Sequence, residues 1–124
     1  NKWFNDKTKE YIEANKKISF WSLPKILIVV LKRFDNRGRK KTNIIKFPFE
    51  LDLSKYCVGY KKNTYKYNLI SVANHDGSLN SGHYYSYVKN INNNWYTYND
   101  TMVSQMESSN VVSQSAYCLF YRLK

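Results

Sequence analysis

Alternation of side chains at every second residue is the feature that most constrains this chain, because it predicts strands rather than helices. It is clearest in the stretch YKYNLISVANH, whose first eight residues present two faces, Tyr65, Tyr67, Leu69 and Ser71 on one and Lys66, Asn68, Ile70 and Val72 on the other. The β-branched run Ile26–Leu31 is typical of a buried strand. Met106–Val112 is the one helical candidate. We therefore predict a strand-dominated α+β fold with a mostly antiparallel sheet.

Length and charge narrow the function classes. The 124 residues suit one domain or part of a larger one, and the start at Asn1 suggests a piece of a longer protein. ILIVVL is too short to span a bilayer. The net charge of +11 comes from scattered lysines, which favour a solvated surface over a nucleic-acid site. We expect no membrane or nucleic-acid partner. Two cysteines without metal-type spacing favour an intracellular protein, cytoplasmic or nuclear.

The segment from residue 83 to residue 99 reads as two strands around an asparagine-rich turn. A turn centred on Ile91 places His83 opposite Asn99, where the imidazole and the carboxamide come within hydrogen-bonding reach. A slip of one residue places Asp100 there instead. The same register sets Tyr85 and Tyr87 opposite Thr97 and Trp95.

A histidine held by a carboxamide is what a thiol hydrolase needs from its base. The histidine takes the thiol proton, and the third group fixes its orientation. The glycine-containing loop Gly77–Gly82 lets a substrate backbone pass close to the base. The bland alternative is a surface hairpin whose histidine has no chemical role. The pattern of residues leaves these two interpretations open.

Four blocks of sequence, read in order, favour the first interpretation: LPKILIVVLKRF, YNLISVANHDGSLNSGHYYSYVKN, WYTYNDTMVSQ and SAYCLFYRL. Together they resemble the C-terminal half of a ubiquitin-specific protease catalytic domain, from the family of papain-like cysteine deubiquitinases with fingers, palm and thumb. The resemblance implies that residues 1–124 form a partial catalytic domain of this kind, with fingers and palm present and the thumb absent.

The resemblance also implies roles for individual residues. His83 falls on the catalytic base, Asn99 on the residue that orients it, and Asp100 on a neighbouring acidic position. Three further residues fall near the ubiquitin tail: Tyr84 lines the channel for its Gly-Gly end, Gly82 closes the blocking loop 74–82, and His75 lies in that loop as the less favoured candidate for the base. Residues 35–43 match a second blocking loop.

Two departures from the family pattern are visible. The block that holds the nucleophilic cysteine lies outside this chain, so we expect the fragment alone to be inactive. Positions that hold one cysteine pair of a zinc knuckle in many relatives carry Asn5 and Thr8, so we expect no metal, and no cofactor is implied. Cys57 precedes His83 and Asn99 in the papain order, but no helix pattern follows it to activate a thiol. Cys118 reads as a small core residue.

The function implied is a thiol-dependent deubiquitinase that hydrolyses the isopeptide or peptide bond after the C-terminal glycine of ubiquitin. This chain would supply the His/Asn half of the triad and part of the ubiquitin-binding surface. The alternative is an inactive ubiquitin-binding scaffold, and a basic nucleic-acid-binding domain is a third hypothesis. The expected partners are ubiquitin and ubiquitinated proteins. The fragment is also expected to self-associate through a palm face left exposed.

Overall fold

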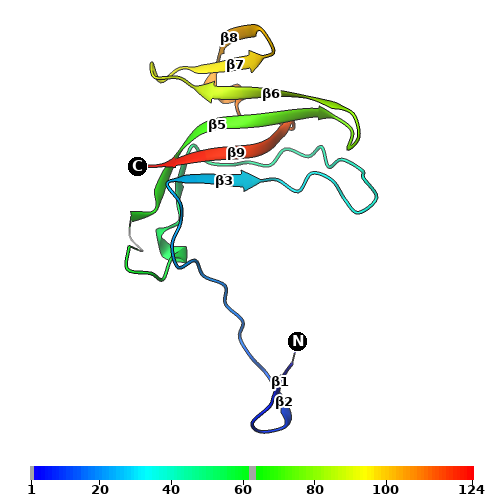
Figure 1. The fold of residues 1–124 in the computed structure, drawn as a ribbon, viewed down its shortest axis with the longest axis vertical. Helices are drawn as coiled ribbons and strands as arrows, with labels where there is room; N and C mark the ends of the chain where they lie inside the picture. The colour runs from blue at the N-terminus through cyan, green and yellow to red at the C-terminus, as the bar shows by residue number, and fades with distance from the viewer. Residues whose placement is uncertain (1, 62–63) are drawn as a thin grey trace.

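The computed structural model describes residues 2–61 and 64–124 as a seven-stranded antiparallel sheet and a separate two-stranded hairpin (Figure 1). The hairpin pairs β1 (Trp3–Asn5) with β2 (Glu10–Ile12). The sheet has the order β3-β9-β5-β6-β7-β8, and β4 pairs with the start of β5 on the edge opposite β9, which β6 occupies further along. Its strands are β3 (Ile26–Val30), β4 (Glu50–Asp52), β5 (Lys66–Gly77), β6 (Gly82–Lys89), β7 (Trp95–Asn99), β8 (Met102–Met106) and β9 (Ala116–Leu123). The predicted strand-dominated, antiparallel architecture is confirmed.

The helical candidate at residues 106–112 is wrong as a continuous helix. Met106 ends β8, and only a single 3-10 turn, η3 (Ser108–Asn110), follows. Val111 is fully buried directly after that turn. The segment is therefore a turn that returns one apolar side chain to the core, and a single turn is long enough to do so.

β5 alternates as predicted only in its first part. Tyr65, Tyr67 and Leu69 are buried on one face. The pairing with β9 then shifts between Leu69 and Ser71, which is a β-bulge. One extra residue reverses the alternation, so Val72, predicted on the opposite face, is also buried. The bulge therefore determines which side chains reach the far end of β5, where the candidate site lies.

The prediction that Ile26–Leu31 is a buried strand is also wrong. Among the described residues β3 pairs with β9 alone and forms an edge of the sheet. Leu27 and Val29 pack against the core, whereas Ile26, Ile28 and Val30 are 45%, 54% and 57% exposed. The β-branched run marks a strand, but it does not show how many faces of that strand are covered.

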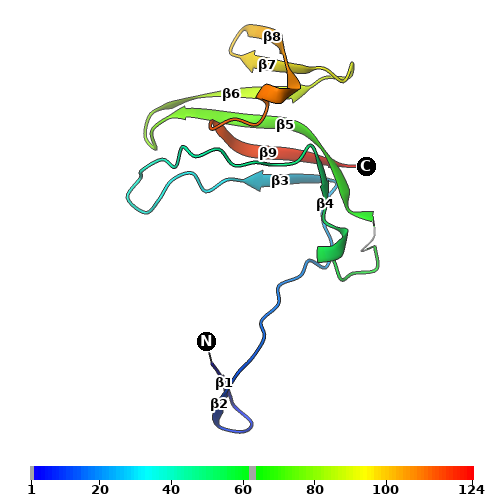
Figure 2. The ribbon, with the colours of Figure 1, turned by 180° about the vertical axis from the view of Figure 1, so that it is seen from behind.

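Segment 43–49 runs across one face of the sheet (Figure 2). The core lies between this segment and the strands. The Tyr121 hydroxyl donates to the Pro48 carbonyl over 2.7 Å, and the Leu69 amide donates to the Phe49 carbonyl over 2.7 Å. Phe47 packs into the same core. These contacts fix the segment over β9 and β5 even though it forms no strand of its own.

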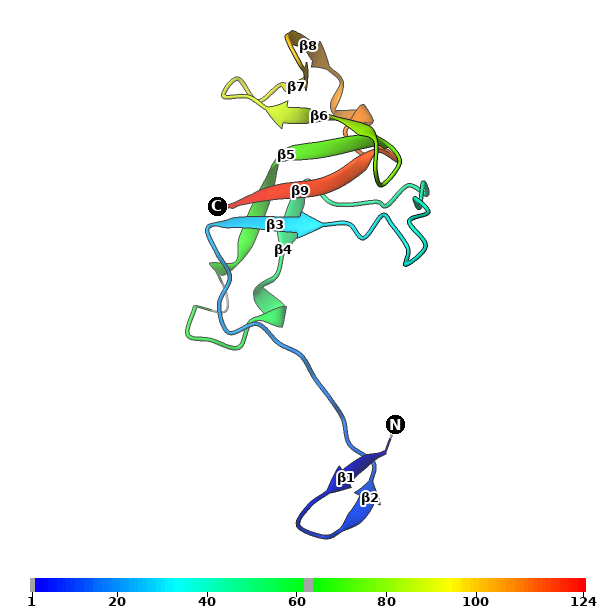
Figure 3. The ribbon, with the colours of Figure 1, turned by 45° about the vertical axis from the view of Figure 1, so that its right-hand side comes forward.

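The β1–β2 hairpin projects from one end of the sheet on an extended connector (Figure 3). Phe4 and Tyr11 pack edge to face across it, with ring centroids 5.2 Å apart. Of the segments that the structure describes, none is a helix long and apolar enough to cross a membrane.

Candidate active site

The β6–β7 hairpin carries the predicted His/Asn pair, but its register differs from the prediction by two residues. Lys89 pairs with Trp95 and Tyr87 with Thr97. The reason lies in the turn, where the Asn90 amide donates to the Asn94 carbonyl over 3.0 Å and Asn93 has a positive φ of 65°. Asparagine tolerates this left-handed conformation, so the turn centres one residue later than expected.

His83 and Asn99 nevertheless meet. Continued beyond its last pair, the observed register sets Asn99 opposite Tyr85, which makes Asn99 the diagonal neighbour of His83 on the same face. His83 Nε2 lies 2.6 Å from Asn99 Oδ1. Because an amide oxygen only accepts, Nε2 carries the proton in this contact, and Nδ1 keeps a free lone pair. The His83 side chain is 50% exposed, so that lone pair is accessible.

Asp100 lies close to the histidine without bonding to it directly. Its Oδ2 is 3.9 Å from His83 Nε2, and its side chain is 78% exposed. A positive φ of 52° at Asp100 turns the chain at once from β7 into β8. The structure therefore gives Asn99 the direct hydrogen bond and Asp100 a longer contact of 3.9 Å with the imidazole.

His75 does not lie in a loop, as was predicted. It belongs to β5, is 4% exposed, and stands in an aromatic cluster with Phe34, Tyr84 and Tyr117. Burial, and secondarily the nearby Lys40 ammonium, lower the pKa of His75, while Asp76 acts in the opposite direction. A neutral, enclosed imidazole has a packing role here and does not present itself to a bound peptide.

Gly82 has a reason to be glycine within the chain itself. A Cβ at this position would lie 2.2 Å from His75 Nε2 and 2.6 Å from the Asp76 carbonyl oxygen. The loop between β5 and β6 is only residues 78–81, because both strands extend further than the sequence predicted. His75 thus packs on the first residue of β6, immediately before the candidate base.

Loop 35–43 and the shorter loop 78–81 lie at the same end of the sheet (Figure 1). The buried Arg33 fixes the end of loop 35–43, because its Nη1 donates to the Asn43 carbonyl over 2.6 Å and its Nε to the Ala116 carbonyl over 2.9 Å. A Cβ on Gly38 would lie 3.4 Å from Leu79 Cδ2 of the shorter loop. Tyr84, 58% exposed, packs against His75 and Tyr117 at this end of the sheet. Its predicted place in a substrate channel stays a prediction.

Neither cysteine is placed as a nucleophile for His83. Cys57 is buried just after η1 (Ser54–Tyr56), which Figure 1 shows at the end of the sheet opposite the β5–β6 loop. Cys118 lies in the middle of β9, and burial raises the pKa of its thiol. Both positions favour packing roles over nucleophilic ones.

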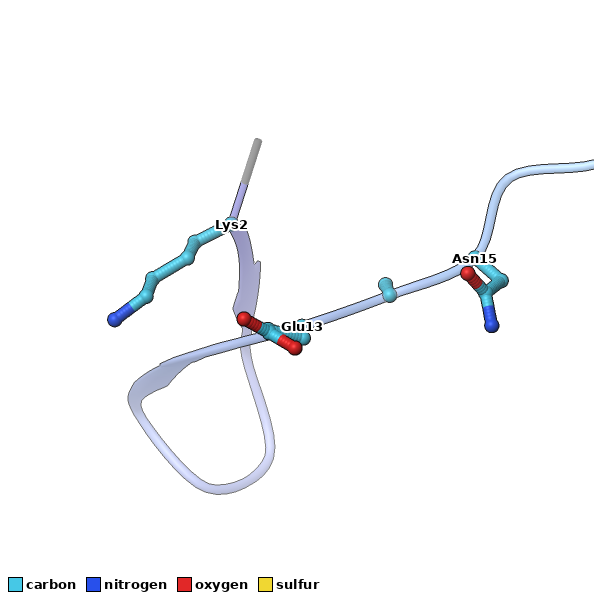
Figure 4. A pocket seen from close by; sticks show the side chains of 4 residues that line it. Lys2, Glu13 and Asn15 are labelled. Carbon is cyan, nitrogen blue, oxygen red and sulfur yellow. The ribbon is translucent and has the colours of Figure 1, made fainter.

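The β1–β2 hairpin does not suit a zinc ion. Asn5 Oδ1 accepts the Lys7 amide over 3.0 Å and so stabilises the turn, and Thr8 offers no soft ligand. Within residues 2–61 and 64–124, no group of three or more His, Cys, Asp or Glu residues could hold a metal. A hollow near Lys2, Glu13 and Asn15 has no convergent set of polar groups, since Figure 4 shows these side chains spread along the hairpin and its connector.

Known proteins that are similar to this chain are enzymes of one kind. The family model described as ubiquitin carboxyl-terminal hydrolase matches residues 2–121. Ubiquitin carboxyl-terminal hydrolase 9 of Arabidopsis thaliana is 43% identical over 125 residues, covering 97% of this chain and 14% of the relative. Ubiquitin carboxyl-terminal hydrolase 4 of Mus musculus is 40% identical, covering 97% of this chain and 13% of the relative.

Solved structures agree with the sequence relatives. A SAGA DUB module matches with a TM-score of 0.73 and 34% identity, over 86% of this chain and 25% of the matched chain. A SAGA DUB module bound to monoubiquitin matches all of this chain and 29% of the matched one, with a TM-score of 0.81 and 30% identity. The chain therefore spans about a seventh of the curated relatives and under a third of the solved chains it matches.

Proposed function

Because this chain belongs to the ubiquitin carboxyl-terminal hydrolase family, we propose that it supplies the base-bearing part of a thiol-dependent deubiquitinase. The observation that carries the proposal is the 2.6 Å contact between His83 Nε2 and Asn99 Oδ1. In this proposal residues 1–124 are the fingers and palm of a larger catalytic domain, and the thumb supplies the nucleophilic cysteine. The isolated chain then lacks the thiol it would activate and is inactive.

The mechanism follows from the free lone pair on His83 Nδ1. The imidazole takes the proton of the cysteine thiol, and the thiolate attacks the carbonyl carbon of the last glycine of ubiquitin. The imidazolium then protonates the departing amine, which leaves ubiquitin as a thioester on the cysteine. Finally His83 deprotonates a water molecule that attacks the thioester, releasing free ubiquitin and the thiol.

Asn99 holds the imidazole through both protonation states. Its Oδ1 accepts from Nε2, so the histidine needs no charged partner to keep its tautomer. Asp100, at 3.9 Å, stabilises the imidazolium once the thiol proton has moved. We therefore assign Asn99 as the main orienting residue and Asp100 as an electrostatic assistant.

Ubiquitin is the proposed ligand, since two of the matched structures contain ubiquitin or its aldehyde. We propose that its C-terminal tail passes between the loop 35–43 and the loop 78–81 and reaches His83 alongside Tyr84. The half-exposed Tyr84 ring is available to contact an extended peptide on this route.

The test uses the full-length protein and a fluorogenic substrate attached to the C-terminus of ubiquitin. Removing the orienting amide in Asn99→Ala should lower kcat by about 10- to 100-fold, less than the about 100- to 10,000-fold that a general base contributes, because His83 itself remains. Asp100→Ala should lower it by no more than about threefold, as expected for an exposed charge. Ubiquitin affinity should be unchanged in both variants.

Two results would count against the proposal. Ubiquitin binding without turnover by the unaltered protein would support the inactive scaffold instead. A larger loss in Asp100→Ala than in Asn99→Ala would reverse the roles of the two residues.

A further inference from the structure

A single hydrogen bond from Asn99 does not fix the His83 ring, because the imidazole can still swing about that contact. Tyr85 lies two residues from His83 along β6, towards the β6–β7 turn and on the same face of the sheet. The two rings are nearly parallel, 18° apart in plane, with centroids 6.4 Å apart. This ring is therefore a second surface against which the imidazole can settle.

Tyr85 is itself held firmly. Its ring meets that of Tyr87 edge to face at 5.7 Å and 68°. Burial raises the pKa of Tyr85 to about 12, with a lowering contribution from the Ser115 hydroxyl and raising ones from Tyr87 and Asp76. The phenol thus stays neutral at physiological pH, with its hydroxyl among polar neighbours.

Those neighbours tie three strands together. Ser115, just before β9, donates its hydroxyl to Asp76 Oδ1 over 2.5 Å. The Ser115 carbonyl accepts the His75 amide over 2.9 Å. Asp76 is the direct cross-strand partner of His83. Ser115 and Asp76 therefore join the ends of β9 and β5 beside the start of β6, where the base stands.

We propose that Tyr85, whose ring lies nearly parallel to that of His83, is a positioning residue that limits the rotation of the imidazole which a single hydrogen bond to Asn99 leaves free. The inference rests on the proposed function, since a base needs this restraint only if it transfers protons. Correct alignment of a catalytic group contributes to kcat, whereas ubiquitin binding depends on surfaces elsewhere. A positioning role thus predicts a change in kcat with KM preserved.

The test measures kcat and KM of the full-length protein on the fluorogenic ubiquitin substrate. Tyr85→Leu should lower kcat about tenfold and change KM by less than about twofold, because alignment is lost while binding remains. Tyr85→Phe keeps the ring and should retain at least about a third of kcat. Tyr96→Leu is the matched control, a partly buried tyrosine of β7 that pairs with Val88 on the opposite face.

Ser115→Ala keeps the inference testable if Tyr85→Leu fails to fold. Loss of the Ser115 hydroxyl, and with it the hydrogen bond to Asp76 beside Tyr85, should lower kcat by about threefold at unchanged KM. Wild-type kcat in a folded Tyr85→Leu, or in Ser115→Ala, would overturn the inference, as would an equal loss in Tyr96→Leu. His83→Ala distinguishes a failure of the proposed function from a failure of the inference about Tyr85. If that variant retains turnover, the proposed function is wrong. If it is inactive, the results for the Tyr85 and Ser115 variants test the role of Tyr85 alone.

Discussion

At the scale of residues, side-chain parity was easier to predict than register. The sequence predicted that His83 and Asn99 share a face, and they do, at 2.6 Å. It did not predict the left-handed Asn93, which moves the turn and makes the contact diagonal. A histidine side chain reaches a diagonal neighbour on the same face, so His83 and Asn99 are in contact in either register.

His75 shows what single-sequence reasoning missed at this scale. Its neighbours Phe34, Tyr84 and Tyr117 come from three different segments, so no local pattern announces its burial. The Tyr85–Ser115–Asp76 cluster was missed for the same reason. The one local signal was the position of Tyr85 two residues beyond the base, on its face of the strand.

The buried His75 predicts a loss of stability in mild acid. Its pKa is lowered in the folded state, chiefly by burial, so below the unfolded value of about 6.5 the unfolded chain binds more protons. Stability should therefore fall as the pH drops from about 6.5 towards the folded pKa. Thermal unfolding at pH 7.5 and pH 5.5, values chosen on either side of that about 6.5 midpoint, should show a larger decrease for the wild type than for His75→Gln.

Equal decreases in the two proteins would contradict a neutral, buried His75. The lowered pKa values of Asp35 and Asp52 do not interfere, because their contributions are lost at lower pH than this window.

At the scale of elements, strands were predictable and their surroundings were not. Period-two alternation identified the first part of β5, and the asparagine-rich turn identified the hairpin of β6 and β7. The bulge after Leu69 has no distinctive residue to mark it, and it reverses the alternation. The edge position of β3 depends on which strands pair, a property of the whole sheet.

Two valines test the buried face of β5 beyond the bulge and the exposed face of the edge strand β3. Val72 is fully buried beyond the bulge, whereas Val30 is 57% exposed on the edge strand. Val72→Ala should lower the free energy of unfolding by about 2 kcal/mol through lost burial and a residual cavity. Val30→Ala should change it by less than about 0.5 kcal/mol, as at most surface positions. Denaturant unfolding measures both, and similar values would contradict the assigned faces.

At the scale of the whole molecule, the chain leaves an apolar strip on its surface. Ile26, Ile28 and Val30 lie on one face of the edge strand β3, more than 40% exposed each. In the larger catalytic domain proposed above, other parts of the protein can cover this strip. In the isolated chain an apolar edge strand favours pairing with a second copy.

Sedimentation of the isolated chain checks that expectation. The chain should associate at increasing concentration, and Ile28→Lys should shift it towards the monomer, because the charge lies at the centre of the strip. Ile91→Lys in the β6–β7 turn adds the same single charge at a fully exposed apolar position outside the strip and should have little effect. A chain that stays monomeric throughout would contradict association through this face.

The proposed function requires that His83, one of the two histidines in the chain, is the base. Turnover of a fluorogenic ubiquitin substrate by the full-length protein measures this directly, with folding checked by thermal unfolding and binding by ubiquitin titration. His83→Ala should lower kcat by at least about 1,000-fold with ubiquitin still bound, while His75→Gln should keep most of its activity at pH 7.5, a pH where an ordinary histidine of pKa about 6.5 is already neutral. Retained turnover in His83→Ala would contradict the account.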